Sequence, residues 1–467
     1  MRPYLLASLL ISVAAPSLSQ QSTAIAPAPI LVDPLVTALR ADALANDHYA
    51  WDITEGLTTE VGPRLAGTEA EARARDWAVA KLRALGFANV RVEPFDMATW
   101  TRGAENAEVL SPFPQRLVVA ALGNSGSTPA EGITGEVVGF DTLSDLEAAP
   151  DATVRGKIVF VSHAMPRTQD GSGYGYFGGP RRQGPGIASR KGAIAIVIRS
   201  IGTDYHRNPH TGVMSFPEGV KPIPAGALPL PDAEQLQRIL KRGKPVTMHL
   251  TLVSQRGRGE SGNIIAEVPG RDPKLPPVLV GGHLDSWDQG TGAIDDATGV
   301  AIAAASAKRI MDAGRPLRTI RIVWFGAEEP GLMGGQDYLK KHGAEAHYAL
   351  AESDFGAGRI WRVNSRLGKD REGEAKMLQA ALAPLGIVPG ALDKADGSDI
   401  EPLLDAGMPG VGLSQDGTHY FDVHHTPDDT LDKVDPEALR QNVAAWTAML
   451  AVLAGPIEPE PKRRSRR

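Results

Sequence analysis

Cysteine is absent from this chain of 467 residues. Disulfide bonds therefore cannot stabilise the fold, and no thiolate is available as a metal ligand or as a catalytic nucleophile. Any metal site has to be built from His, Asp and Glu side chains.

Long apolar runs are missing as well. The run from Leu5 to Ala15 is too short to span a bilayer, and no later apolar stretch is long enough to do so. Because Arg2 precedes this run and small residues follow it, residues 1–19 are predicted to be a secretory signal peptide. We therefore expect an exported protein, periplasmic or extracellular after cleavage, without a membrane span.

The chain also lacks a strong charge of one sign. Lys and Arg number 49 and Asp and Glu number 55, so the formal net charge is −6. This weak negative charge argues against nucleic acid as a partner. The basic cluster "KRRSRR" falls in residues 457–467, which are predicted to be a disordered tail.

The length of the mature chain predicts more than one structural unit. Residues 20–110 and 256–456 combine helical patterns with apolar strands, which indicates an α/β domain with a mostly parallel sheet flanked by helices. Residues 111–255 are rich in Gly, Pro and β-branched residues. They are predicted to form a β-rich domain inserted between the two parts.

Several apolar strands in the second part lead into residues that can bind a metal. "PVLVGGH" ends at His283, "TIRIVWFGA" runs into Glu328 and Glu329, and "YALAES" is followed by Asp354. Asp295 precedes the helix that follows the first of these strands. Because sites in open α/β sheets form beyond the carboxyl ends of the strands, we expect these side chains to converge.

A further strand, "PGVGLS", leads into "QDGTHYFDVHHTPDDT", which contains His424 and His425. The residues alone do not decide which histidine is the ligand. Taken singly, each candidate has an ordinary explanation, such as a helix cap or a solvated turn. Their coincidence at one edge of one sheet favours a metal site.

Charge counting indicates how many cations this site holds. Two neutral imidazoles and three carboxylates carry a charge of −3, which two divalent ions and a bridging hydroxide neutralise. Ligation by His and carboxylate without sulfur suits zinc, with cobalt or manganese as substitutes. One carboxylate then has to bridge the two ions, and Asp295 is the candidate.

Two further carboxylates are candidates for catalysis. Glu328, next to the ligand Glu329, is the candidate general base for attack by a water bound to both metals. Asp285 is placed to accept the second imidazole N–H of His283. The sequence contains no H-E-x-x-H, G-x-S-x-G or G-x-x-x-x-G-K-[ST] motif. It therefore gives no sign of a zinc-binding helix, of a serine nucleophile on a sharp turn or of a phosphate-binding loop.

The motifs "GGHLDSWDQGTGAIDDATG", "FGAEEPGLMGGQDY", "ESDFGAG", "DGSDIEPLLDAGMPG", "HHTPDDT" and "GPRLAGT" resemble those of the co-catalytic di-zinc aminopeptidases. Within that family, "HLDSWD" and "ESD" favour the carboxypeptidase Q subfamily. The segments "VRGKIVFV" and "KGAIAIVI" make the inserted region similar to a protease-associated domain. The resemblance covers nearly the whole mature chain.

The resemblance implies a di-zinc exopeptidase fold, two Zn²⁺ ions per chain and Glu328 as the general base. It implies five ligands: His283, Asp295, Glu329, Asp354 and His425. The ligand histidine is the one directly before Thr, hence His425. Three further residues are expected beside the site: Ser398, Asp399 and His424.

The implied activity is that of an exported zinc exopeptidase acting on dipeptides or small peptides with a free N-terminus. The resemblance also implies a homodimer. Two alternatives remain open, a catalytically inactive receptor-like or binding protein of the same fold and a glutaminyl cyclase with one zinc. Retention of all five ligand positions and of Glu328 favours the peptidase. Dipeptidase, aminopeptidase and carboxypeptidase action all remain open.

Overall fold

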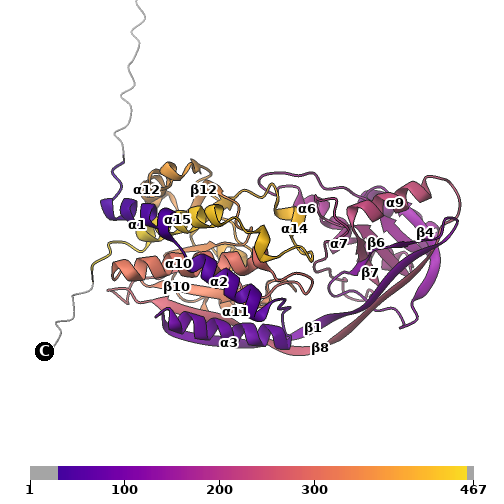
Figure 1. Cartoon of the computed structure of the whole chain (residues 1–467), viewed down its shortest axis with the longest axis horizontal. Helices are drawn as coiled ribbons and strands as arrows, with labels where there is room; N and C mark the ends of the chain where they lie inside the picture. Colours follow the sequence, from indigo (N-terminus) through magenta and orange to yellow (C-terminus); the bar gives the residue numbers. More distant parts are fainter. Residues whose placement is uncertain (1–29, 460–467) are drawn as a thin grey trace, which may run out of the picture.

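The computed structural model describes residues 30–459, which form two lobes joined by long strands (Figure 1). The predicted signal peptide, residues 1–19, lies outside the described residues, as do residues 460–467 of the predicted tail. Within residues 30–459, no helix has both the length and the apolar character needed to cross a membrane.

The larger lobe is built on a sheet whose central strands are parallel. In order across the sheet these strands are β14 (Gly410–Gln415), β11 (Ala349–Glu352), β9 (Val278–His283) and β10 (Ile320–Phe325). The antiparallel strands β12 (Ile360–Arg366) and β8 (Thr247–Val268) flank them. The outer strands are β13 (Val388–Pro389) and β1 (Ala88–Ser111). The predicted α/β fold with a mostly parallel sheet is confirmed.

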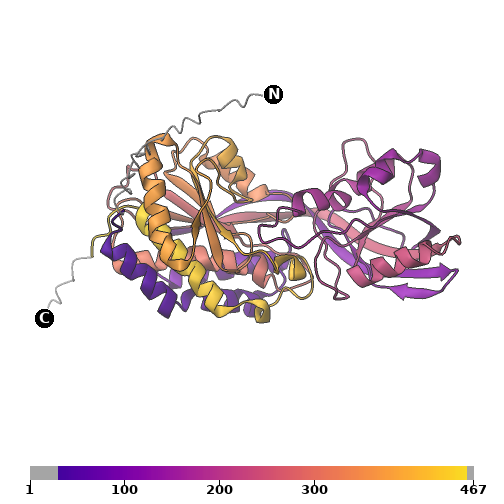
Figure 2. The same ribbon diagram turned by 90° about the horizontal axis from the view of Figure 1, so that it is seen from above.

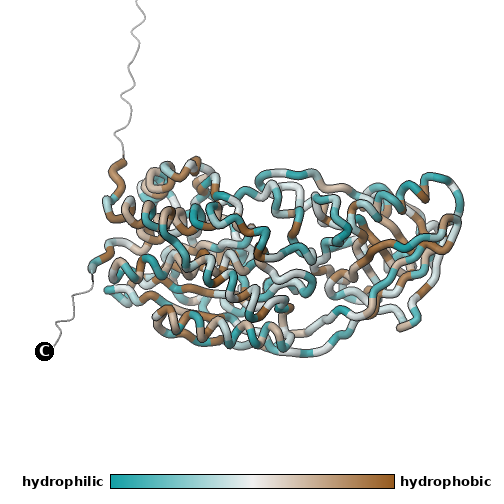
Figure 3. The backbone as a smooth tube through the Cα atoms, in the orientation of Figure 1, coloured by the Kyte–Doolittle hydropathy of each residue, from teal (hydrophilic) through white to brown (hydrophobic). Residues whose placement is uncertain are grey.

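Side chains of the central strands are buried on both faces of the sheet, which explains why these strands are almost wholly apolar. In β9, Val278 and Val280 pack into one core and Leu279 packs into another. In β10, Ile322 and Val323 divide between the same two cores. Because successive side chains point to opposite faces, each strand contributes to both cores. Hydrophobic stretches occur within both lobes, and hydrophilic ones predominate along outer loops (Figure 3).

Helices cover both faces of this sheet (Figure 2). One core includes residues of α1 (Pro34–Asn46), α2 (Tyr49–Gly56), α3 (Glu69–Ala84), α10 (Thr298–Ala313), α12 (Glu372–Leu382) and α15 (Pro436–Leu453). The other core includes residues of α11 (Met333–His342) and α13 (Glu401–Asp405). This layering leaves the strand ends as the accessible edge of the sheet.

The smaller lobe contains strands packed with short helices. Four neighbouring strands are parallel: β4 (Ile133–Phe140), β5 (Ile158–Val161), β6 (Ala195–Arg199) and β7 (Ala225–Leu228). Two short strands are antiparallel to their partners, β2 (Gln115–Leu117) to β1 and β3 (Ala120–Ala121) to β7. The helices are α4 (Leu143–Ala148), α5 (Asp151–Val154), α6 (Tyr174–Phe177), α7 (Gly179–Arg182), α8 (Gly184–Arg190) and α9 (Leu230–Leu240).

Strands β1 and β8 pair with each other and run from one lobe into the other (Figures 1 and 2). β8 also pairs with β10 in the larger lobe and with β4 in the smaller lobe, so one sheet of 14 strands passes through both. The predicted domain limits at residues 111 and 255 fall at the end of β1 and inside β8. That division, and the protease-associated character of the inserted region, stay predictions.

Candidate metal centre

The five side chains expected to bind metal come together beyond the carboxyl ends of β9, β10, β11 and β14. His283 is the last residue of β9, Glu329 follows β10, and Asp354 follows β11. His425 follows the short helix α14 (Tyr420–Val423), which comes after β14. Because β10, β9 and β11 are parallel neighbours, the residues that follow them emerge side by side.

Asp295 lies between the two histidines. Its Oδ1 is 2.9 Å from Nε2 of His283, and its Oδ2 is 3.2 Å from Nε2 of His425. His283 Nε2 is also 3.3 Å from Oδ1 of Asp354, and His425 Nε2 is 3.0 Å from Oε2 of Glu329. The side chains thus form two groups, each with its own histidine and its own carboxylate, and the two groups share Asp295.

The spacing of these atoms fits metal ligation. Two donor atoms bound to one zinc at tetrahedral angles lie about 3.3 Å apart, given ligand distances of about 2.0–2.2 Å. The four contacts between the histidines and the carboxylates span 2.9 to 3.3 Å. Oε1 of Glu329 is buried without a hydrogen-bond partner among the described residues, so it is an acceptor left for a cation.

The excess of carboxylates controls the protonation of the histidines. Burial alone lowers the pKa of His425, but the charge of Glu329 and hydrogen bonds with Asp295 and Glu329 raise it to about 10. Burial also lowers the pKa of His283, but the charge of Asp354 and hydrogen bonds with Asp295 and Asp354 outweigh it and hold that pKa well above its ordinary value. Without metal, both imidazoles therefore carry a proton at neutral pH, and cations would replace this positive charge on binding.

Two aspartates hold the backbone around Asp295. The carboxylate of Asp429 accepts the N–H of Ile294 at 2.6 Å and that of Asp295 at 3.2 Å. Asp296 accepts the N–H of His283 and that of Gly299, both at 3.0 Å. Neither aspartate was assigned a role at the site from the sequence, although "AIDDATG" and "HHTPDDT" contain them.

Arg64 is a buried cation that supports the same region. Its guanidinium donates to the carbonyl oxygens of Leu284, Thr291 and Gly292. Burial lowers the pKa of Arg64, and the acidic groups, Asp429 first, act against this. Arg64 therefore positions the loop after His283 and places a positive charge near the aspartates of the site. Sequence reasoning missed it, although "GPRLAGT" contains it.

Glu328 and Glu329 form a turn whose backbone is held by Asp285. Oδ1 of Asp285 accepts the N–H of Glu328 at 3.0 Å, and its Oδ2 accepts the N–H of Glu329 at 3.3 Å. Glu328 belongs to neither ligand group and lines the cavity beside them. Loss of hydration raises the pKa of Glu328 well above its ordinary value. The negative charges of Asp354 and Glu329 raise this pKa further, whereas the positive charge of His283 lowers it.

The contact of Asp285 with His283 differs from the expectation. Nδ1 of His283 faces the backbone carbonyl oxygen of Asp285 at 3.0 Å, whereas the nearest carboxylate oxygen is 3.8 Å away. The carboxylate is engaged by the Glu328–Glu329 turn. The imidazole is therefore oriented by the main chain, and the Asp285 side chain acts on the turn.

Ser398 and Asp399 occupy different positions beside the site. Oγ of Ser398 donates to Oδ2 of Asp354 at 2.5 Å, which orients that carboxylate. Asp399 is buried and accepts the N–H of Gly335 in α11 at 3.2 Å. Asp399 therefore supports the packing of α11 rather than contacting the ligand groups directly.

His424 lies against His425, and their rings stack with centroids 3.5 Å apart. Nε2 of His424 is 3.5 Å from Oδ2 of Asp295, so both histidines approach the shared carboxylate. His425 also contacts Glu329, at 3.0 Å. The geometry therefore favours His425 as the ligand.

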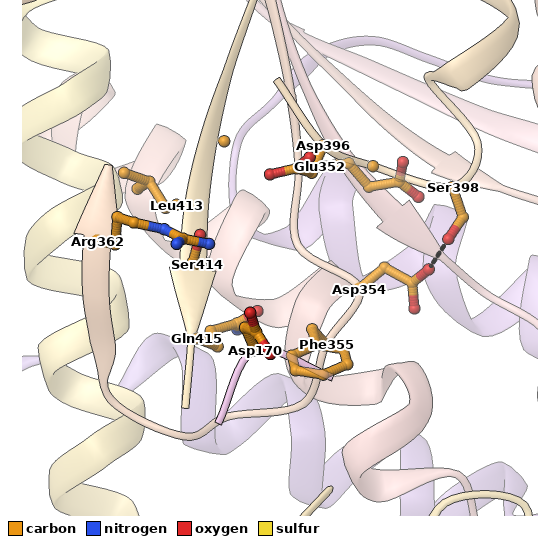
Figure 4. A pocket seen from close by; sticks show the side chains of 12 residues that line it. Asp170, Glu352, Asp354, Phe355, Arg362, Asp396, Ser398, Leu413, Ser414 and Gln415 are labelled. Carbon is orange, nitrogen blue, oxygen red and sulfur yellow. Dashed lines mark hydrogen bonds between the residues drawn. The ribbon is translucent and has the colours of Figure 1, made fainter. Parts of the chain in front are cut away.

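Two cavities share a wall formed by Asp354, Phe355 and Ser398. One, of about 270 Å³, is lined by the ligand residues other than His283 and by Glu328. The other, of about 320 Å³, extends along β12 and β14. Arg362 points into this second cavity from the side opposite Asp354 (Figure 4).

Comparison with known proteins finds several relatives that are peptidases. The profile of Peptidase family M28 matches residues 263–450. Carboxypeptidase Q of Bos taurus is 35% identical over 407 residues, which are 85% of this chain and 84% of the bovine chain. The crystal structure of a peptidase M28 precursor from Shewanella amazonensis SB2B has a TM-score of 0.88 and 47% identity, over 91% of this chain and 98% of that chain. A zinc aminopeptidase from Bacillus subtilis shares the fold, with a TM-score of 0.61 and 21% identity, over 86% of this chain and 93% of its own.

Proposed function

The chain belongs to peptidase family M28 and is a metallo-exopeptidase, and we propose that it uses zinc to hydrolyse dipeptides or small peptides with a free N-terminus. The observation that carries this proposal is the position of Asp295, whose two oxygens face two different histidines. A carboxylate placed in this way suits two ions better than one.

In this proposal His283, Asp295 and Asp354 would hold one zinc, and His425, Asp295 and Glu329 would hold the other. Each group supplies three protein ligands, which leaves a position open for water or substrate, as in catalytic zinc sites. The zinc named in the Bacillus subtilis relative of the same fold agrees with this choice of metal.

Glu328 is the proposed proton carrier. Zinc, when bound, polarises a peptide carbonyl and acidifies water. Glu328 takes the proton from the attacking water and delivers it to the leaving amine, since it lines the cavity and is not needed as a ligand. Asp285 holds the turn that carries Glu328, and Ser398 orients Asp354.

The charge of the cavity favours a substrate with a free α-amine. Asp295, Glu328, Glu329 and Asp354 all line it. An ammonium group gains from such a surface, whereas an acylated N-terminus does not.

Acetylation of the substrate tests the proposal. With zinc-loaded protein, N-acetyl-alanyl-leucine should be hydrolysed with a kcat/KM about 100-fold or more below that of alanyl-leucine, because a buried charged contact is lost. Elemental analysis should give more than one zinc per chain. Full peptidase activity with a single bound ion would contradict the two-zinc site. Loaded protein that cleaves no peptide would support the inactive, receptor-like alternative.

A further inference from the structure

The cavity that contains the ligand groups is completed by the smaller lobe. Tyr174, Arg181 and Val213 of that lobe line it together with the acidic residues of the larger lobe. Among the described residues that line this cavity, Arg181 is the only Lys or Arg. The one Lys or Arg of this cavity therefore comes from outside the metal-binding motifs.

Arg181 is held next to the candidate metal centre. Its Nη1 donates to the carbonyl oxygen of Thr211 at 2.9 Å, and Nδ1 of His425 lies 3.3 Å from the same oxygen. A Cβ atom on Gly212 would come within 2.2 Å of Arg181 Nη1 and 2.8 Å of His425 Nδ1, so the chain passes closely by both groups. The guanidinium also lies over the ring of Tyr174, 5.2 Å from its centroid.

The guanidinium lacks an anion. Arg181 is only 4% exposed, yet no carboxylate of residues 30–459 lies within ion-pair distance of it. Its Nε is buried without a hydrogen-bond partner among the described residues. Guanidinium has five N–H donors, and a buried cation with unused donors is costly unless an anion binds to it.

We propose that Arg181 binds the C-terminal carboxylate of the substrate, which makes the enzyme selective for dipeptides. This inference rests on the proposed exopeptidase function. A cavity of about 270 Å³ suits a small molecule, and its acidic part already suits the α-amine. A peptide whose carboxylate follows one residue after the cleaved bond keeps that group within the same small cavity, where a planar guanidinium can bind it with two hydrogen bonds.

The test compares acid and amide forms of the same dipeptides in wild type and in Arg181→Gln. The probes are alanyl-leucine, glycyl-leucine and leucyl-leucine, each also as the C-terminal amide. In wild type, amidation should lower kcat/KM about 100-fold, the loss expected for a buried charged contact. In Arg181→Gln, the acid should fall to about the level of the amide while the amide changes little, since the contact is already absent.

Two variants serve as controls. Arg182 donates to the carbonyl oxygens of Tyr174 and Gly175 and does not line the cavity, so Arg182→Gln should keep the wild-type preference for the acid. Arg181→Lys keeps the charge without the planar fork, so it should recover part of the preference that Arg181→Gln loses.

Four results would overturn the proposal. Loss of the preference in Arg362→Gln, with Arg181→Gln unaffected, would assign the carboxylate to the adjoining cavity. An equal fall for acid and amide in Arg181→Gln, with loss of zinc, would mean that Arg181 only positions His425 through Thr211. Equal hydrolysis of acid and amide by wild type would refute the role of Arg181 and leave the exopeptidase function intact. Failure of zinc-loaded wild type on every peptide would instead refute the proposed function, and with it this inference.

Discussion

At the scale of the residue, the two adjacent glutamates show how surroundings separate identical side chains. Glu329 contacts His425 and belongs to a ligand group, whereas Glu328 faces the cavity. The main chain of both is held by one carboxylate, that of Asp285. A turn, unlike a helix or a strand, allows neighbouring side chains to serve two different functions.

The first prediction separates these two roles. Glu328→Gln should lower kcat by about 10²–10⁴-fold and leave the zinc content unchanged, because it removes a proton carrier and no ligand. Glu329→Gln should lower the zinc content. Steady-state kinetics and elemental analysis of both variants provide the measurement. Near-normal turnover of Glu328→Gln would exclude it as the general base, and loss of zinc from that variant would make it a ligand.

At the scale of the element, the packing of α3 on β8 places a carboxyl group inside the protein. Glu71 of α3 is buried, and its carboxyl accepts from Oγ of Ser261 in β8 at 3.0 Å and lies 3.3 Å from Nε of Arg75. Burial raises the pKa of Glu71 to about 7, although Arg75 acts in the opposite direction. The helix thus docks with a group that prefers to be neutral.

The second prediction follows from the sign of that shift. Because the pKa of Glu71 is higher in the folded state than its ordinary 4.5, its contribution to stability falls as pH rises from about 4.5 through about 7. Gln stays neutral, so the stability of Glu71→Gln relative to wild type should increase over this range. The increase should reach at most ~3.5 kcal/mol, since the pKa rises from 4.5 to about 7 and one pKa unit corresponds to ~1.4 kcal/mol.

Urea unfolding of both proteins at pH 5 and pH 8 measures this change. Glu69→Gln, at an exposed position of the same helix, is the matched control, and its stability relative to wild type should be the same at both pH values. The same difference in unfolding free energy at both pH values would refute the raised pKa.

At the scale of the whole molecule, the site depends on both lobes. Strands β1 and β8 connect the lobes, and the smaller lobe contributes Arg181 and Tyr174 to the cavity. Carboxylates that follow three strands, β9, β10 and β11, meet in one place, and they repel one another when no cation is bound. The homodimer that the family resemblance implies stays a prediction.

The third prediction concerns removal of the metal. Treatment with EDTA should abolish hydrolysis, and zinc should restore it. The thermal midpoint should fall by several degrees, because an ion that binds only the folded state stabilises it by mass action. Differential scanning calorimetry with and without EDTA measures this shift. Glu329→Gln should show a smaller shift, and an unchanged midpoint together with retained activity would exclude a zinc site.

Much of the fold and of the candidate site could be predicted from local patterns. Apolar strands alternating with helices indicated the α/β fold, which the structure and the relatives confirm. His283, Glu329 and Asp354 could be grouped because each follows a strand, and parallel strands bring their carboxyl ends to one edge of the sheet. Hydrophobic periodicity and the order of elements along the chain are properties that a sequence expresses directly.

Tertiary structure alone decided the contacts between distant segments. Arg64 donates to a carbonyl oxygen 220 residues away, and His425 meets a carbonyl oxygen 214 residues away. Only packing shows that the main chain of Asp285, and not its carboxylate, faces His283. The same holds for Arg181, since the sequence does not show which of the adjacent Arg181 and Arg182 lines the cavity. Sequence patterns report which face or end of an element a residue occupies, whereas the partner that it meets there depends on how the elements and the two lobes pack.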